Sequence, residues 1–199
     1  MTPIRDQLLE MLKAVATALG EDLRERLVFV GGCTTALFIT AADETVICRM
    51  RLGALKVDFM PDDEGILGFS NRWYARGIDT ATRHQLSEGL TIQVLTPALF
   101  LATKLEAFAG RGNNDLFTSR DAEDILLVVD GRESLLDEIT ATEDDVREFV
   151  ASWFRALLEH VDFDDFLEGN IRGPAGRVDL VRSRFVAISQ SADGVAHDH

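Results

Sequence analysis

The chain has 199 residues, 46% of them hydrophobic, which is enough for one domain, or one domain with a small helical extension. Its 34 acidic and 20 basic residues give a net charge of −14, which argues against indiscriminate binding to nucleic acids or anionic membranes. The two cysteines lack metal-ligand spacing. The sequence shows neither a secretion signal nor a stretch apolar enough to cross a bilayer, so we expect a cytoplasmic protein.

The first expected element is an amphipathic helix that Thr2 caps and Pro3 opens. Its apolar residues recur at helical spacing up to Gly20: Ile4, Leu8, Met11, Leu12, Val15 and Leu19. We expect this helix to pack on a sheet, because four strands are predicted to follow. They lie at about 27–30, 45–51, 55–60 and 90–95, and the second and third form a hairpin. Residues 1–95 are therefore predicted to form an α+β core.

From Thr96 onward the pattern becomes helical. The pair Thr96-Pro97 begins a helix that reaches Gly110, and Ser119 caps a second helix that reaches about Val129. We therefore expect residues 96–188 to form a helical C-terminal half.

A third helix is predicted at Thr142, which resembles a capping box together with Asp145. An apolar stripe follows that cap, and a shorter one covers 180–188. Residues 189–199 lack periodicity and are predicted to form a disordered tail.

The segment 28–37 is typical of a buried strand, a tight turn at Gly31 and Gly32, and the start of a helix. Glycines let backbone amides approach a ligand closely, and a helix N-terminus adds partial positive charge. The turn therefore suits a phosphate, although a Gly-Gly turn between a strand and a helix also occurs without a ligand.

Asp58 lies on a predicted strand whose alternate residues are apolar. A carboxylate near a phosphate-binding turn is the residue type that holds Mg²⁺, but an aspartate on a solvated strand face fits the same pattern. Lys104 borders the apolar stripe of the helix that begins at Pro97. Its ammonium group would neutralise a triphosphate, or it would be a lysine that extends to solvent.

Two further segments carry candidate polar groups. Asp121 and Asp124 are one helical turn apart, so they share a face and act either on the helix dipole or as a base for an acceptor hydroxyl. The segment 69–76 pairs aromatic residues with arginines, a pattern that suits stacking on a base or ordinary packing.

In this order, the segments resemble the AbiEii/AbiGii toxin-type nucleotidyltransferases of bacteria, a branch of the DNA polymerase β-like superfamily. The similarity runs from about Leu27 to Asp130. It is carried by five segments: 29–37, 55–61, 66–74, 100–108 and 120–125. The resemblance implies a nucleotidyltransferase-like mixed β-sheet with flanking helices. It also implies transfer of a nucleoside monophosphate from an NTP, with Mg²⁺, to an acceptor hydroxyl.

The resemblance also implies roles for individual residues. The expected phosphate-binding set is Gly31, Gly32, Thr34, Lys104 and Arg120. The expected catalytic set is Asp58, Lys104 and Asp121, with Asp58 as the metal ligand. RNA, including transfer RNA, is an implied acceptor, and a cognate antitoxin is an implied partner.

One departure from the family concerns the metal. Members carry a strand with two aspartates separated by one residue, which hold Mg²⁺. Here only Asp43 and Glu44 are acidic between Thr40 and Arg49. Adjacent residues of a strand point to opposite faces, so these two are poor substitutes for such a pair. A second hypothesis therefore stays open, namely a catalytically inactive nucleotide-binding or protein-interaction module with the same fold.

Overall fold

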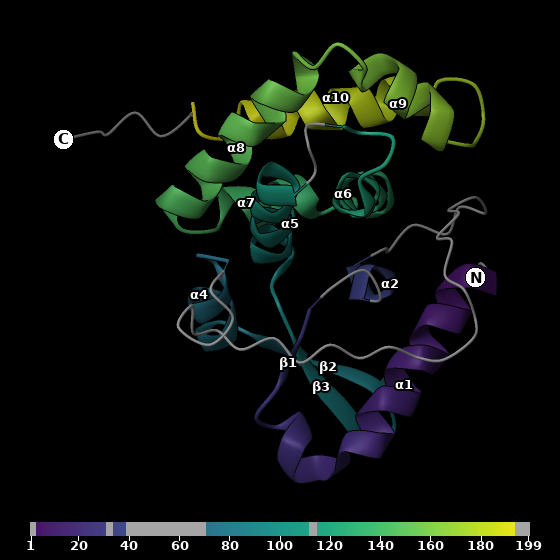
Figure 1. Ribbon diagram of the computed structural model, residues 1–199, viewed down its shortest axis with the longest axis vertical. Helices are drawn as coiled ribbons and strands as arrows, with labels where there is room; N and C mark the ends of the chain where they lie inside the picture. Colours follow the sequence, from purple (N-terminus) through teal and green to yellow (C-terminus); the bar gives the residue numbers. More distant parts are fainter. Residues whose placement is uncertain (1–2, 31–33, 39–70, 112–114, 194–199) are drawn as a thin grey trace.

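The computed structural model describes residues 3–30, 34–38, 71–111 and 115–193. The predicted strands at 45–51 and 55–60, and the predicted site residues Gly31, Gly32 and Asp58, lie outside these ranges. Figure 1 shows two parts of the molecule. A small sheet with its neighbouring helices forms one part, and a layered group of helices from the C-terminal half forms the other.

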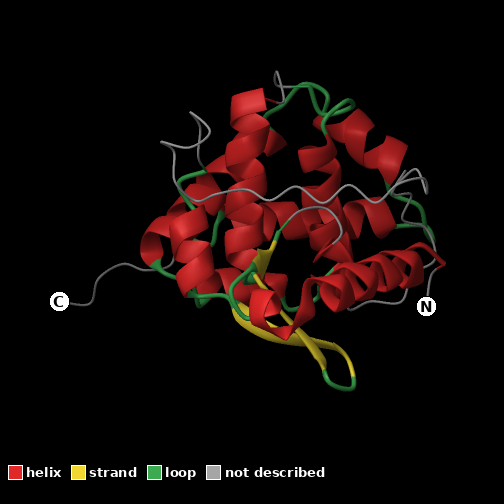
Figure 2. Ribbon diagram, turned by 60° about the horizontal axis from the view of Figure 1, so that its bottom comes forward, coloured by secondary structure: helices red, strands yellow, loops and turns green. Residues whose placement is uncertain are grey.

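Three described strands form the sheet in the order β1-β3-β2. Their bounds are Val28–Phe29 for β1, Thr82–Ser87 for β2 and Leu90–Val94 for β3. β1 runs parallel to β3, and β2 runs antiparallel to it. The chain is therefore α+β with a small mixed sheet, as predicted at that level, and Figure 2 shows the sheet at one side of the helices.

The sequence analysis predicted β1 and β3 but missed β2. The β2 sequence, Thr-Arg-His-Gln-Leu-Ser, lacks the alternation of apolar residues that identified the others. It is an edge strand among the described ones, and four of its six residues are exposed. Its pairing comes from the tight turn at Gly89, where φ is +69°, a backbone conformation that favours glycine.

Helix α1 (Pro3–Arg24) covers one face of the sheet (Figure 1). A small cluster of buried apolar residues joins the two: Leu12, Ala16, Leu37, Ile92 and Val94. The helix was predicted to end at Gly20, and its regular geometry does break there, at a φ of +74°. A further helical turn then carries the chain to Arg24.

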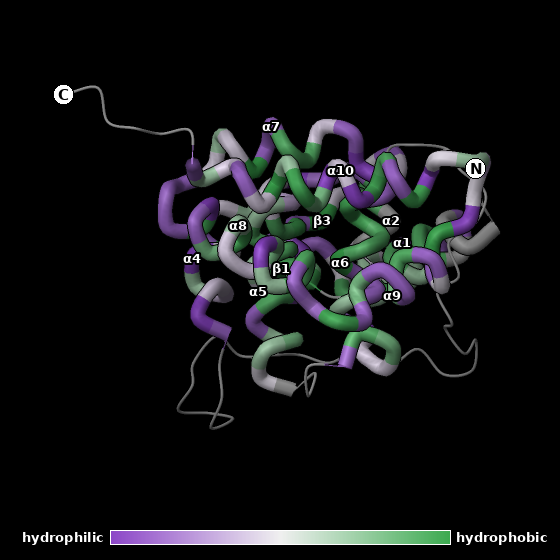
Figure 3. Tube along the Cα trace, turned by 90° about the horizontal axis from the view of Figure 1, so that it is seen from above, coloured by the Kyte–Doolittle hydropathy of each residue, from purple (hydrophilic) through white to green (hydrophobic). Residues whose placement is uncertain are grey.

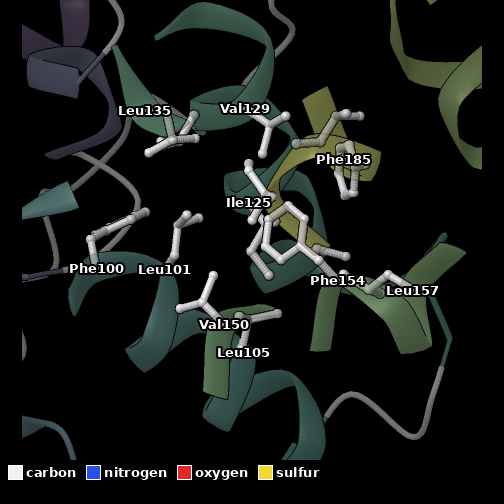
Figure 4. Packing of buried hydrophobic residues seen from close by; sticks show 14 of the residues in the cluster. Phe100, Leu101, Leu105, Ile125, Val129, Leu135, Val150, Phe154, Leu157 and Phe185 are labelled. Atoms are coloured by element: carbon white, nitrogen blue, oxygen red, sulfur yellow. The ribbon is translucent and has the colours of Figure 1, made fainter. Parts of the chain in front are cut away.

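The helical half consists of the following elements: α5 (Pro97–Arg111), α6 (Arg120–Gly131), α7 (Leu135–Thr140), α8 (Asp144–Leu158), α9 (Phe163–Asn170) and α10 (Arg177–Ser189). α5 lies in its centre, because Phe100, Leu101 and Leu105 are all fully buried. Figure 4 shows side chains from α5, α6, α7, α8 and α10 converging on one core. In Figure 3, hydrophilic colour marks outlying segments such as α4, and hydrophobic colour gathers towards the middle.

Two short helices connect the sheet to the helical half. α2 (Thr35–Phe38) packs on α1 and α6, and α4 (Tyr74–Asp79) packs on α5. Gly77 lets α4 approach Leu95, the residue that follows β3, since a Cβ at position 77 would lie 2.5 Å from Leu95 Cδ2. Within the part of the chain that the structure describes, none of the helices has the length and apolarity needed to cross a lipid bilayer.

Two details of the helical half correct the sequence analysis. The capping box at Thr142 and Asp145 is wrong, because Glu143 is the N-cap of α8 and its side chain makes no capping hydrogen bond. The Thr142 carbonyl oxygen instead accepts a hydrogen bond from Arg147 Nη1. Ser189, predicted as the first residue of the tail, is the buried last residue of α10, and its carbonyl oxygen accepts from Arg155 Nη1 at 2.7 Å.

Candidate functional site

The sheet brings two strand-to-helix connections to one edge. β1 and β3 are parallel and in register, with Phe29 opposite Val94, so their carboxyl ends share that edge. The predicted glycine turn follows β1, and α2 begins after it at Thr35. Only Leu95 and Thr96 separate β3 from α5. In open sheets with parallel strands, ligands bind outside the carboxyl ends of the strands, so this edge is the candidate ligand site.

Aromatic contacts hold α2 against α5. The rings of Phe38 and Phe100 lie 4.9 Å apart between centroids. Arg132 Nη1 also donates to the Phe38 carbonyl oxygen at 3.1 Å, which ties the end of α2 to the residue after α6. Thr34, a predicted phosphate-binding residue, precedes this anchored helix and is 1% exposed.

Lys104 forms a buried ionic cluster with two aspartates of α6. Its Nζ lies 2.5 Å from Asp124 Oδ2 and 3.0 Å from Asp121 Oδ1. The three side chains are 11%, 9% and 7% exposed, respectively. The ammonium group also lies over the Phe100 ring, 5.6 Å from its centroid. Lys104 is therefore a fixed cation inside the protein, rather than the lysine extending to solvent that the sequence also allowed.

Burial is the largest influence on the pKa of both Lys104 and Asp124, but its outcome differs between them. Burial disfavours the charged ammonium and lowers the pKa of Lys104, yet the two carboxylates outweigh this and raise that pKa above its ordinary value. Burial raises the pKa of Asp124, and the nearby ammonium offsets only part of the rise. Lys104 thus stays charged at neutral pH.

α6 places both aspartates on the face that packs against α5. Ser119 caps the helix as predicted, and its hydroxyl oxygen accepts from the Ala122 backbone amide at 3.3 Å. Asp121 and Asp124 follow the same spacing as the buried apolar residues of α6. Acidic residues within an apolar stripe were a signal in the sequence for a buried ion pair, and the analysis noted only their shared face.

The structure therefore brings Lys104 and Asp121 together and adds Asp124, which was not in the predicted set. Because Asp121 is buried and paired with an ammonium group, its geometry suits holding Lys104 rather than acting on an acceptor hydroxyl. Arg120, the remaining predicted phosphate-binding residue described here, is exposed at the start of α6. Its charge acts on Asp124.

The described part of the aromatic and arginine segment, residues 71–76, is a packing element. Trp73 is 6% exposed, and its ring lies 5.0 Å from the Phe149 ring. The Arg72 guanidinium lies over both rings, and its Nε is 3.0 Å from Glu106. Asn71 donates to the Thr103 carbonyl oxygen at 2.9 Å. These contacts fix the chain that enters α4, and they leave no open face of Trp73 on which a base would stack.

The described residues do not fit a magnesium ion. Within the ranges that the structure describes, no three His, Cys, Asp or Glu side chains group as metal ligands would. Asp121 and Asp124, the buried carboxylates among the described residues, both hold Lys104. The Mg²⁺ prediction thus depends on Asp58, outside the described residues, and we derive no chemical step from a metal.

A shallow depression of about 130 Å³ lies between the end of α1 and the β2-β3 hairpin, with Arg24, Glu25 and Arg83 in its lining. Of the predicted site residues that the structure describes, namely Thr34, Lys104, Arg120 and Asp121, none lines it. Comparison of the chain with models of known protein families, with curated proteins and with solved structures found no match. The candidate site therefore rests on the sheet edge and on the Lys104 cluster.

Proposed function

We propose that this chain is a nucleotidyltransferase-like protein that binds an NTP and transfers its nucleoside monophosphate to an acceptor hydroxyl. The observation that carries the proposal is the parallel register of β1 and β3. It directs the predicted glycine turn and α5 to the same edge, and α5 carries Lys104. Membership of the AbiEii/AbiGii toxin-type family is part of this proposal, since it is drawn from the sequence segments alone.

The proposed chemistry needs negative charge to be stabilised as it moves. A hydroxyl oxygen forms a bond to the α-phosphorus and loses its proton to water, while the bond from that phosphorus to pyrophosphate breaks, so charge develops on the leaving pyrophosphate. Backbone amides of the glycine turn would hold the phosphates, and the Lys104 ammonium would supply a fixed positive charge nearby. Among the described residues two carboxylates accept from this ammonium group, and the proposal assigns its third N–H group to a phosphate oxygen.

A second candidate is a nucleotide-binding or protein-interaction module without transferase activity. The specific observation in its favour is the lack of paired aspartates between Thr40 and Arg49. The pairing of Asp121 and Asp124 with Lys104 supports it as well, because neither carboxylate is available to replace the missing pair. An RNA acceptor and an antitoxin partner belong to the first candidate, and the partner alone fits the second.

Titration with ATP, GTP, CTP and UTP, each with and without Mg²⁺, separates the candidates. Metal-dependent binding followed by release of pyrophosphate in the presence of RNA supports the transferase. Binding without pyrophosphate release supports the module, and no binding of any NTP contradicts both nucleotide proposals. Asp58→Ala is the matched variant, and full transferase activity in it would contradict the predicted metal ligand.

A further inference from the structure

We propose that Asp124 is the residue that positions Lys104, so that the ammonium group is held over Phe100 at the entry to the helical half. Asp121 assists from the preceding helical turn. The inference rests on the proposed function for its consequence, which is nucleotide binding. The geometry of the cluster carries the positioning itself.

The two aspartates differ in how closely they approach the buried Lys104 ammonium group. The Asp124 contact with the Lys104 Nζ, at 2.5 Å, is shorter than the Asp121 contact at 3.0 Å. Side chains under about one tenth exposed have little water to replace a lost partner, so a charge-assisted hydrogen bond there is a strong constraint. The shorter contact therefore decides where the ammonium group lies.

The position of the ammonium group also relates Lys104 to α2. With its ammonium over the Phe100 ring, Lys104 is held close to the aromatic pair of Phe100 and Phe38. Phe38 ends α2, the helix that follows the predicted glycine turn. The cluster on α6 thus fixes a cation on α5 relative to α2, and a flexible lysine side chain would otherwise occupy many rotamers.

The sequence allows a direct test, because it contains only three lysines: Lys13, Lys56 and Lys104. Amine acetylation read by mass spectrometry therefore reports each site separately. Only the neutral amine reacts, and the pKa of Lys104 is raised, so acetylation of Lys104 in the folded wild-type protein should be slower than that of Lys13. Lys13 on α1, which is 33% exposed and paired with an exposed Glu10, is the internal reference.

Three variants test the assignment. Asp124→Asn keeps the shape of the side chain and removes its charge, and we expect it to speed Lys104 acetylation about tenfold, the effect of one unit of pKa on the neutral fraction. Asp121→Asn should have a smaller effect. Glu148→Gln makes the same change of net charge on the exposed face of α8 and should have none. An unchanged Lys104 rate in Asp124→Asn, or a larger change in Asp121→Asn, would overturn the proposal.

A measurement on the wild-type protein covers the case in which Asp124→Asn does not fold. Isotopic labelling of lysine gives a spectrum with three side-chain ammonium groups, and we expect that of Lys104 to titrate above the ordinary range for lysine, about 10.4. Titration of Lys104 at or below that range would also overturn the proposal, since a lysine held by two carboxylates cannot lose its proton so readily.

Measurement of NTP binding by the variants separates this inference from the proposed function. If the wild-type protein binds an NTP, Asp124→Asn should weaken the binding more than Glu148→Gln does, because the ammonium group is no longer fixed. Tighter binding in Asp124→Asn would show that the carboxylate only repels phosphate and would overturn the positioning role. If acetylation changes as expected but no NTP binds the wild-type protein, the proposed function fails and the positioning of Lys104 stands.

Discussion

The two parts of this molecule differ in how much they bury. In the helical half, α5 is surrounded by apolar side chains from α6, α7, α8 and α10, and several phenylalanines are fully buried. In the sheet part, the separate cluster under α1 consists of Leu12, Ala16, Leu37, Ile92 and Val94 among the described residues. Because stability follows the apolar area removed from water, the helical half should carry most of it. The proposed site lies where the two parts meet.

This difference suggests that the two parts have different roles in the proposed site. A well-packed helical half can hold a charged cluster such as Lys104 with its aspartates, because the surrounding core fixes the backbone on both sides. The sheet part supplies the turn that would approach phosphate. Regions with few buried apolar contacts are also those that open locally at low cost, which suits a ligand-binding edge. The predictions below test this division, beginning with the largest effect.

Phe154→Ala should have the largest effect on the free energy of unfolding, a loss of about 3–5 kcal/mol. Phe154 is fully buried, and its ring lies 4.9 Å from that of Phe185. Denaturant unfolding followed by circular dichroism measures the loss. Phe117→Ala is the matched control, because Phe117 is 51% exposed and touches Phe166 only at its edge, so its loss should be about 1 kcal/mol. Equal losses would break the proposed contrast between core and surface.

Lys104→Met should cost about 3–5 kcal/mol at neutral pH, because it leaves two buried carboxylates without their cation. Burial already raises the pKa of Asp124, and removal of the ammonium group raises it further. A carboxyl whose folded-state pKa is above its unfolded value destabilises the protein as pH rises through that range. The deficit of Lys104→Met should therefore shrink as pH falls below neutral, and a deficit independent of pH would contradict the buried cluster.

Ile92→Ala should cost about 2–3 kcal/mol, near the lower end for such a change, since the small cluster under α1 can collapse around the space. Native-state hydrogen exchange should show faster exchange in β2 and β3, while α5 and α8 keep their protection. Equal acceleration in both parts would mean that they unfold together. That result would contradict the lower stability assigned to the sheet part.

Ser119→Ala should cost about 1 kcal/mol, because the hydroxyl that caps α6 is lost. Thr142→Ala is the informative partner. The sequence predicted a cap there, but the structure places Glu143 at the N-cap of α8, so this change should cost less than about 0.5 kcal/mol. A larger loss for Thr142→Ala than for Ser119→Ala would contradict the N-cap at Glu143 and support the predicted capping box.

Arg76→Gln should have the smallest effect, under about 1 kcal/mol, because the ion pair it forms across the two parts is exposed. The Arg76 guanidinium lies 2.6 Å from Asp145 Oδ1, and its hydrogen bond is the main cause that lowers the pKa of that carboxyl. A carboxyl whose pKa is lower in the folded state stabilises that state at pH values above its pKa in the unfolded state. This stabilisation is lost as pH falls through the pKa of the folded state. The difference between wild type and Arg76→Gln should thus begin to shrink as pH falls below about 4 and vanish only below the lowered pKa of the folded state.

The sequence predicted the elements whose signals are local. Ser119 before an apolar stripe marked the start of α6, and the pair Thr96-Pro97 marked that of α5. β2 was missed because an exposed edge strand needs no apolar face, and its partner supplies the backbone hydrogen bonds. The wrong cap of α8 has another cause: Thr142 has the residue type of a cap, but the helix begins one residue later, with Glu143 as its N-cap.

For the candidate site, the sequence identified Lys104 and Asp121 as separate candidates but did not pair them. Their contact depends on how α5 and α6 pack, and residue spacing along one helix does not contain that information. Asp124, which makes the shorter contact, was assigned no role in the predicted set. The spacing of both aspartates with the apolar residues of α6 is the signal in the sequence that indicates their burial.

Hydrogen exchange measured by mass spectrometry, with and without a saturating NTP, tests the central claim most directly. Our account predicts that the nucleotide slows exchange in peptides that cover residues 28–38 and the first three turns of α5, while α9 and α10 are unaffected. Protection confined to the outer helices, or the same exchange with and without every NTP, would contradict a nucleotide site at the edge where β1 and β3 end.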